Sequence, residues 1–270
     1  MSVLIGVDFT SAPRAAKPIT VAHGRLAGEE IHLDRLAALP DWPSFDALLN
    51  TPGPWLGAFD FPFGLPREGL TALGWPHPDW ATLVRHVATL SKTDFRAALD
   101  ADRLRRPMGA RYPHRATDAT AHSHSPMKLV NPPVGLMFFE GAPRLLAAGC
   151  RLPGLHDGDP MRIAVEAYPG LLARRITRAS YKSDTRRKQS PERLAARQHI
   201  VAELIAGTAL AGLRLTLTPE QRTSLIADAR GDWLDAVLAL AQAARCARHG
   251  APQFGMPAHA DPLEGWIATA

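Results

Sequence analysis

The first 66 residues contain an order of elements that few folds share: three consecutive strands, a helix and a buried strand. The three strand-like segments alternate apolar and polar residues and are joined by short turns; they are VLIGVDFTS, KPITVAHGRLA and EEIHLDRLAAL. A helical segment, DWPSFDALLN, then precedes WLGAFDFPFGLP, an apolar run typical of a strand covered on both faces. This order predicts an α/β fold in which an antiparallel three-strand meander is joined by parallel strands.

The chain changes character after the fourth strand. Two helical segments, HPDWATLVRHVATL and KTDFRAALDADRL, are followed by a long stretch rich in His, Pro, Ser and Met, which we interpret as a loop. A fifth strand, MRIAVEAYPG, comes next, and helices are expected over 171–178, 191–205, 219–227 and 229–244. The pattern predicts a single domain over residues 1–270, in which helices flank the sheet. An insertion at 67–160 is expected to cap this domain.

Five acidic residues stand at the ends of these elements. Asp8 ends the first strand, Asp60 the fourth and Glu166 the fifth, while Asp232 and Asp235 begin the last long helix. Ligands of open α/β sheets collect outside the carboxyl ends of the strands, so we expect the three strand-end acids to converge. Converging carboxylates repel one another, and a divalent cation relieves that repulsion. Oxygen ligands without cysteines favour Mg²⁺ or Mn²⁺, and two such ions suit phosphodiester hydrolysis by an activated water.

The roles of the five acids differ in this hypothesis. Asp8, Asp60 and Asp235 are the predicted metal ligands, and Asp232 and Glu166 are predicted to be further ligands or bases that position the water. An acid in a first helical turn also favours the helix dipole, which is an alternative explanation for Asp232. Asp235 borders the apolar stripe of its helix, where an unpaired charge is costly, and therefore needs a cation.

A polar loop in the insertion supplies candidate substrate contacts. Arg111 and Arg115 are predicted to hold phosphates, His114 to shuttle a proton near neutral pH, and Lys128 to contact substrate. The alternative for Arg115 is a local ion pair with Asp118.

Basic residues are concentrated in segment 171–200, which holds nine of them against two acids. Such an excess of positive charge favours the binding of a polyanion, so nucleic acid is the expected partner. Lys182 is predicted to contact this substrate. A solvated surface is the alternative, because clustered basic residues alone are a weak signal. Thr10 and Ser11, directly after the first strand, are further candidate substrate contacts.

Composition excludes several classes of protein. Two cysteines far apart, Cys150 and Cys246, indicate neither a disulfide framework nor a cysteine metal site. No segment approaches the eighteen uninterrupted apolar residues of a membrane span, and no basic leader precedes an apolar run. We therefore expect a cytoplasmic protein that does not associate with membranes.

Four segments carry a resemblance to a known family. IGVDFTSAPRAAKPITVAHGRL, GAFDFPFGLP, AVEAYPG and GDWLDAVLALAQAA resemble the family called domain of unknown function 429, which consists of predicted nucleases with a ribonuclease H-like fold. The resemblance spans nearly the whole chain. It implies a ribonuclease H-like mixed sheet and a metal-dependent nuclease. In the wider superfamily, which includes Holliday-junction resolvases, the first strand, the fourth strand and the last helix each supply an acid, and Asp8, Asp60 and Asp232 or Asp235 stand at those places. Glu166 matches the E-x-x-P strand end of the family.

Two other functions remain open on the sequence. Actin-like kinases and ATPases share this topology and hold nucleotide phosphates at a turn after the first strand, where this chain has Asp8, Phe9, Thr10 and Ser11. That turn keeps the hydroxyls but lacks the glycine that would let backbone amides approach a phosphate. The third possibility is a non-catalytic nucleic-acid-binding protein that uses the basic segment alone, for which the acids would be dispensable.

Overall fold

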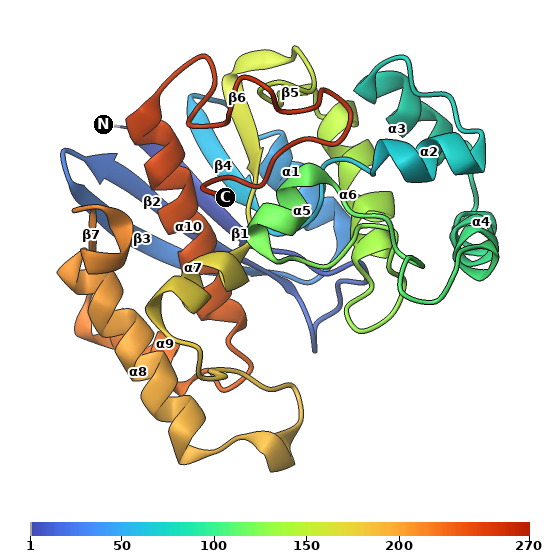
Figure 1. Cartoon of the computed structure of the whole chain (residues 1–270). Coiled ribbons are helices and arrows are strands. Elements are labelled where there is room, and N and C mark those ends of the chain that lie inside the picture. The colour runs from blue at the N-terminus through green and yellow to red at the C-terminus, as the bar shows by residue number, and fades with distance from the viewer. Residues whose placement is uncertain (1) are drawn as a thin grey trace.

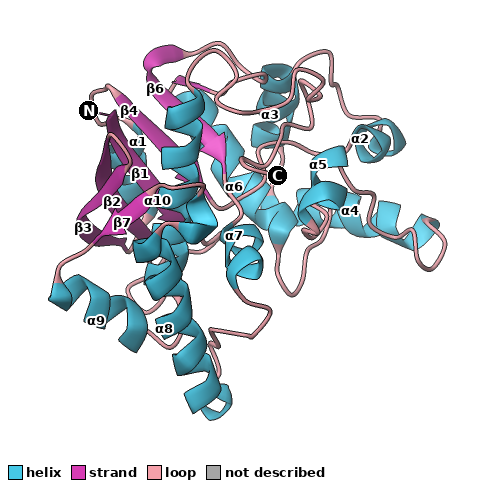
Figure 2. Ribbon diagram, turned by 60° about the vertical axis from the view of Figure 1, so that its left-hand side comes forward, coloured by secondary structure: helices cyan, strands magenta, loops and turns pink. Residues whose placement is uncertain are grey.

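The computed structural model describes residues 2–270, and its centre is one mixed sheet of seven strands with helices on both faces (Figure 1, Figure 2). The strands are β1 (Ser2–Asp8), β2 (Ile19–Ala27), β3 (Glu30–Leu39), β4 (Trp55–Phe59), β5 (Cys150–Arg151), β6 (Asp159–Glu166) and β7 (Arg214–Thr216). Their order across the sheet is β5-β6-β4-β1-β2-β3-β7. The α/β class with a mixed sheet is thus confirmed.

The strand directions follow the sequence pattern. β1, β2 and β3 form the predicted antiparallel meander, and β4 pairs with β1 and β6 with β4 in parallel. The predicted fifth strand is β6 in the structure. The edge strands β5 and β7 were missed, because two or three residues are too few to show an alternation.

Helices fill the connections. They are α1 (Trp42–Leu49), α2 (Arg67–Leu73), α3 (Trp80–Thr89), α4 (Lys92–Arg105), α5 (Ala116–Ala121), α6 (Val134–Ala147), α7 (Pro169–Ile176), α8 (Pro191–Ala206), α9 (Pro219–Ala227) and α10 (Asp232–His249), with short 3₁₀ turns at Arg186–Lys188 and Thr208–Leu210. Side chains on α1, α3 and α6 form one core with Ile5 and Val7 of β1, whereas α7, α8 and α10 form a second core with Leu4. Successive side chains of β1 therefore point to opposite faces of the sheet, each of which is covered by one layer of helices.

The region predicted as an insertion is more helical than expected. α3 and α4 were predicted, but α2, α5 and α6 were not, and the stretch interpreted as a loop contains α5 and the start of α6. Phe95 of α4 and Phe138 of α6 lie in the same core as Val7 of β1, so the region packs onto the sheet. None of the helices described is both long and apolar enough to cross a membrane.

Gly6 sets the distance between β1 and α10. A Cβ atom at this position would lie 2.2 Å from the carbonyl oxygen of Ala236 and 2.2 Å from the amide nitrogen of Leu240. The helix therefore rests directly on the strand backbone, as only a residue without a side chain permits. This contact brings the first turn of α10 to the carboxyl end of β1, where it meets Asp8.

Candidate active site

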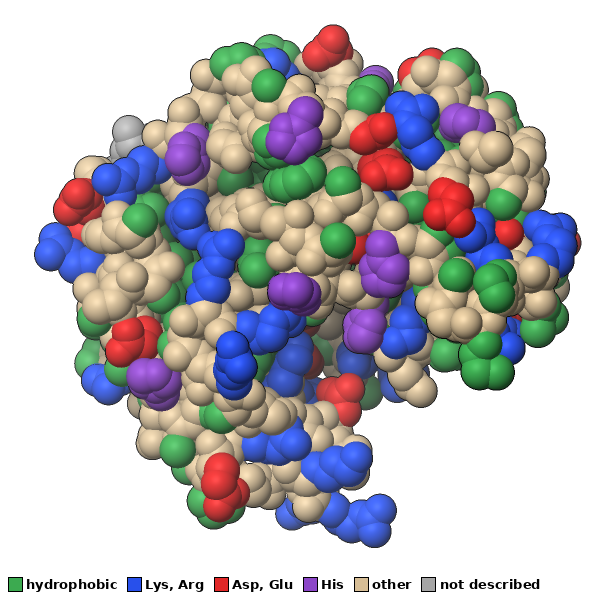
Figure 3. Space-filling view, in the orientation of Figure 1, with side chains coloured by type: hydrophobic (Ala, Val, Ile, Leu, Met, Phe, Trp, Pro, Cys, Tyr) green, Lys and Arg blue, Asp and Glu red, His purple; other side chains and the backbone are tan. Residues whose placement is uncertain are grey.

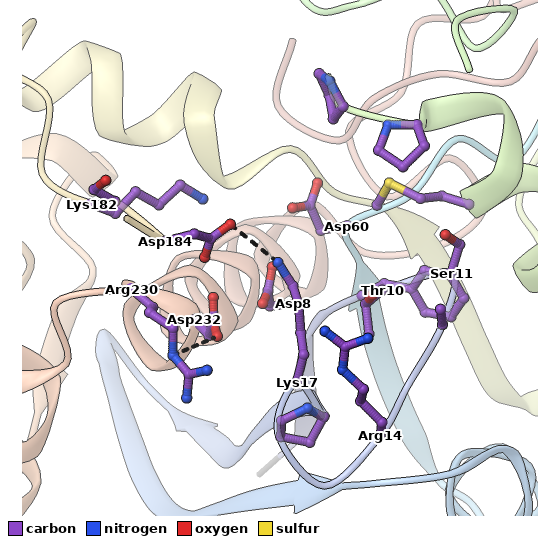
Figure 4. A pocket seen from close by; sticks show the side chains of 17 residues that line it. Asp8, Thr10, Ser11, Arg14, Lys17, Asp60, Lys182, Asp184, Arg230 and Asp232 are labelled. Carbon is purple, nitrogen blue, oxygen red and sulfur yellow. Dashed lines mark hydrogen bonds and ion pairs between the residues drawn. The ribbon is translucent and has the colours of Figure 1, made fainter. Parts of the chain in front are cut away.

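The ends of β1 and β4 place two carboxylates side by side. Val7 is in register with Phe59, and the Asp60 amide donates a hydrogen bond of 2.9 Å to the Val7 carbonyl oxygen, so the pairing continues into the next row. Asp8 and Asp60 occupy that row on neighbouring parallel strands. Side chains in one row of a parallel pair leave the sheet on the same face, so both carboxylates point into one opening (Figure 4).

The first turn of α10 supplies two more carboxylates. Gly231, with a φ of 77°, precedes the helix and turns the chain into it. The Thr20 hydroxyl on β2 donates to the Asp232 carbonyl oxygen at 2.9 Å and approaches the Asp8 carboxylate at 3.4 Å, which ties the helix start to the strand end. Asp232 borders the opening, whereas Asp235 lies beneath it and is fully buried.

Asp235 has two partners on the loop after α7. The Tyr181 hydroxyl donates to Asp235 Oδ1 at 2.5 Å, and the Lys182 ammonium group pairs with Oδ2. Lys182 is 45% exposed, so its side chain reaches inward from the surface. The Arg197 guanidinium donates to the Tyr181 carbonyl oxygen at 2.8 Å and fixes this loop. Sequence reasoning expected a cation for Asp235 but missed Tyr181, because no local pattern joins it to a helix 54 positions later.

The opening is a cleft of about 550 Å³. Its walls carry four acids, the hydroxyl residues Thr10 and Ser11 and four cationic residues. The acids are Asp8, Asp60, Asp184 and Asp232, and the cations are Arg14, Lys17, Lys182 and Arg230. Two of the cations pair with acids at the rim, Lys17 with Asp184 and Arg230 with Asp232 (Figure 4). Lys and Arg side chains also gather around a hollow in the lower part of the face seen in Figure 3. The cleft thus combines partly buried carboxylates with cationic residues at its rim.

The electrostatics of the cluster favour a further cation. Burial, and next the charge of Asp235, raise the pKa of Asp8 well above its ordinary value. The same two causes raise the pKa of Asp60 to about 7. Lys182 lowers both pKa values without cancelling the rise. The excess negative charge and the hard oxygen donors of Asp8 and Asp60 fit Mg²⁺ or Mn²⁺.

Asp235, the third predicted metal ligand, is hydrogen-bonded to other residues. Both oxygens of Asp235 are held by Tyr181 and Lys182, and no group of three or more His, Cys, Asp or Glu side chains within residues 2–270 is arranged to hold a metal ion. The metal site therefore stays a prediction, with Asp8 and Asp60 as the residues that fit it.

The pKa of Asp60 predicts a pH-dependent effect of removing its charge. The unfolded chain releases this proton near pH 4 and the folded protein only near pH 7, so the folded state binds more protons between these values and its free energy of unfolding falls as the pH rises. The Asp60→Asn variant has no carboxyl group at this position, so its free energy of unfolding does not fall with pH for this reason. We expect the variant to be more stable than the parent by about 2–4 kcal/mol at pH 8 and by less than half as much at pH 5. Urea denaturation at both pH values checks this, and equal effects at the two values would contradict it.

Glu166 does not join the other carboxylates as expected. It pairs with Phe59, one row before Asp60, and the one-row offset directs its side chain to the opposite face of the sheet. There the Arg115 guanidinium donates to both of its oxygens at 2.6 and 2.8 Å, and the Phe63 amide donates to Oε2 at 2.9 Å. Glu166 therefore forms a buried ion pair with Arg115 and does not line the cleft, so its role as a ligand or base stays a prediction.

Arg115, which was predicted to hold phosphates, lies in a buried network of ion pairs. Only 2% of its surface is exposed, and it also pairs with Asp118 at 2.9 Å, which is the local ion pair weighed as the alternative. The Arg115 guanidinium also donates a hydrogen bond of 2.9 Å to the Glu264 carbonyl oxygen and so fixes the C-terminal segment. Arg115 thus joins α5, β6 and that segment.

The remaining loop candidates lie outside the cleft. Among the described residues that line it, none is Arg111, His114 or Lys128. Lys128 instead donates to the Asn131 carbonyl oxygen at 2.7 Å, and His114 is exposed. The structure therefore does not bring these three to the carboxylates, although Pro132 and Pro133 of the same stretch line the cleft.

The basic segment is divided between several roles. Lys182 enters the cleft, Arg174 and Arg178 line an adjoining pocket, and Arg197 is only 4% exposed. Arg193 donates to Ser180 and to the Lys182 carbonyl oxygen, which supports the loop under the site. Part of the local positive charge is thus structural, and Lys182 is the basic residue of this segment that lines the cleft.

The comparisons with known proteins return no relative. The chain matches no family model, no curated protein and no solved structure. Its function is therefore inferred from the geometry of the cleft.

Proposed function

We propose that this protein is a metal-dependent phosphodiesterase that acts on nucleic acid, a nuclease. The observation that carries the proposal is the pairing of Asp8 and Asp60 at the ends of parallel strands, in a cleft with a cationic rim. Carboxylates recruit a divalent cation, and cations at the rim neutralise a phosphate backbone. The antiparallel meander followed by parallel strands is also the arrangement that the family resemblance implies, which supports a ribonuclease H-like fold.

The residues of the cleft have separate roles in the proposed reaction. Asp8 and Asp60 would hold Mg²⁺ or Mn²⁺, which supplies a nucleophilic water at neutral pH and charge stabilisation on the phosphate. Lys182, Arg14 and Lys17 bind the phosphate oxygens of the substrate. Asp232, which is partly exposed at the cleft, orients the attacking water.

Lys182 has a second role in this proposal. Its ammonium group already compensates the buried charge of Asp235, so it is held at the floor of the cleft rather than free in solvent. A phosphate that enters the cleft therefore meets a cation whose position is fixed, which lowers the ordering cost of binding. Tyr181 and Asp235 act as positioning residues for this cation.

A cleavage panel tests the proposal. Labelled single-stranded, duplex, hybrid and branched nucleic acids are incubated with Mn²⁺ and with excess EDTA, using the parent protein and Asp60→Asn. We expect the parent to cleave at least one substrate only when Mn²⁺ is present, and Asp60→Asn to lose that cleavage although it is folded.

Two results would overturn the proposal. One is cleavage by Asp60→Asn at the rate of the parent, which would place the activity elsewhere. The other is the absence of any cleavage while the parent binds Mn²⁺ and hydrolyses ATP, which would favour the nucleotide phosphotransfer of actin-like proteins.

A further inference from the structure

A second pocket opens from the carboxylate cleft. It has a volume of about 240 Å³ and shares Asp60 and Lys182 with the cleft. Phe61, Met137 and Tyr168 contribute to its walls, which are mostly apolar. A group in this pocket would therefore lie directly beside a phosphate bound at the cleft.

Apart from Asp60 and Lys182, which also line the cleft, the polar groups of this side pocket carry no net charge. Arg115 and Glu166 both border it, and they neutralise each other through their ion pair of 2.6 Å. His124 also borders the pocket, and burial, followed by the charge of Lys128, lowers its pKa below the ordinary value of 6.5. A neutral imidazole offers one hydrogen-bond donor and one acceptor, and the Ser123 hydroxyl adds a further acceptor. Such walls suit a neutral polar heterocycle rather than an anion.

Two cavities that carry cationic residues meet the side pocket at Asp60 and Lys182. One is the carboxylate cleft, and the other is a pocket of about 340 Å³ between α7 and the loop after it, which also reaches Asp60 and Lys182. The cations are Arg14, Lys17 and Arg230 in the first and Arg174 and Arg178 in the second. Cationic residues in two cavities that adjoin a neutral pocket match a chain of phosphates that carries a neutral ring.

The size and rigidity of the pocket limit what it accepts. Its volume is below the roughly 300–1,000 Å³ of sites for drug-sized ligands, so it holds one ring system. The Arg174 guanidinium lies 4.9 Å from the centre of the Tyr168 ring and donates to its hydroxyl at 3.0 Å, which keeps the ring in place. Fixed aromatic rings are the platforms on which proteins stack unpaired bases.

We infer that the side pocket receives one unstacked base of a single-stranded nucleic acid whose adjacent phosphate lies at Asp60 and Lys182. The inference rests on the proposed function and names its substrate class. A base within a duplex cannot enter without leaving its stack, so a single strand is the favoured substrate.

A pair of tryptophan variants tests the inference. Val134 lines the side pocket, and Val134→Trp fills it; Val130 is 54% exposed, does not line it, and Val130→Trp is the matched control. Dissociation constants are measured by calorimetry, with Ca²⁺ in place of Mn²⁺, for ribose 5-phosphate, a nucleoside 5′-monophosphate and a single-stranded hexanucleotide.

The expected result is a base preference that depends on the pocket. The parent and Val130→Trp should bind the monophosphate at least about tenfold more tightly than ribose 5-phosphate, because stacking of one base contributes on the order of that factor. Val134→Trp should bind the two ligands within about twofold of each other. The hexanucleotide should bind the parent at least about tenfold more tightly than the monophosphate, since it reaches both cationic cavities.

Three outcomes would overturn the inference. The first is that the parent binds the monophosphate and ribose 5-phosphate equally, a result that does not depend on the folding of any variant. The second is that Val134→Trp keeps the parent's preference for the monophosphate over ribose 5-phosphate. The third is that the hexanucleotide binds the parent no more tightly than the monophosphate does. Failure of the proposed function looks different: the base preference would persist while no substrate is cleaved. Cleavage without a base preference would overturn only the present inference.

Discussion

Replacing Asp8 with asparagine will leave the fold intact and lower Mn²⁺-dependent cleavage at least about 10³-fold. The change keeps the shape of the side chain but removes one of the two carboxylates that lie side by side at the ends of β1 and β4. Removing a single electrostatic contact from an active site already costs about 10²–10³ in rate, and a metal ligand is expected to cost more. Cleavage rates at saturating Mn²⁺, together with the Mn²⁺ dissociation constant from calorimetry, measure the effect.

Asp184→Asn is the matched control for this variant. Asp184 also borders the cleft, but it lies on the exposed loop and pairs with Lys17 at 3.3 Å. We expect its rate to remain within about threefold of the parent, because an exposed ion pair contributes little. Unchanged Mn²⁺ affinity and rate in Asp8→Asn would show that the strand-end pair is not the metal site.

Replacing Gly6 with alanine will destabilise the protein by at least about 3 kcal/mol, a fall in Tm of roughly 6–12 °C. The new Cβ atom would lie 2.2 Å from two backbone atoms of α10, which cannot rotate away as a side chain would. The helix must therefore shift away from β1 and take Asp235 with it. Thermal unfolding and cleavage rates of the folded protein should both decrease.

Gly28→Asn separates this effect from a general cost of replacing glycine. Gly28 has a φ of 60° in the turn between β2 and β3, and a Cβ atom added to it would meet nothing within 4 Å. Asparagine tolerates this left-handed conformation, so we expect a loss of less than about 1 kcal/mol. A Gly6→Ala protein as stable as Gly28→Asn would contradict the close contact between β1 and α10.

The strand-end acids show how far the sequence predicts the site. Alternating residues located the end of β1 and an apolar run the end of β4, and the parallel directions of β1, β4 and β6 brought their ends to one edge of the sheet. The sequence does not encode the register between strands in any local pattern. A shift of one row turns a side chain to the other face, which is why Glu166 does not line the cleft that Asp8 and Asp60 share, although it borders the side pocket.

Long-range partners account for most of what the sequence missed. Tyr181 and Lys182 reach Asp235 from a loop without regular structure, and their contact depends on where α7 and α8 pack. Arg115 resembles any polar loop residue until its burial against Glu166 is known. In the insertion, α6 carries an internal proline, Pro143, which conceals a helix from propensity and periodicity alone.

The site joins parts of the chain that the ribosome makes at different times. Thr20, which links the end of β1 to the start of α10, is bonded to a residue 212 positions later. At about 5–20 residues per second, roughly 10–40 s separate the two during synthesis. Over that interval β1 lacks the helix that covers Gly6, and the carboxylates of α10 do not yet exist. The cleft is therefore incomplete until the last long helix docks, so the order of translation delays the assembly of the site until the chain is nearly finished.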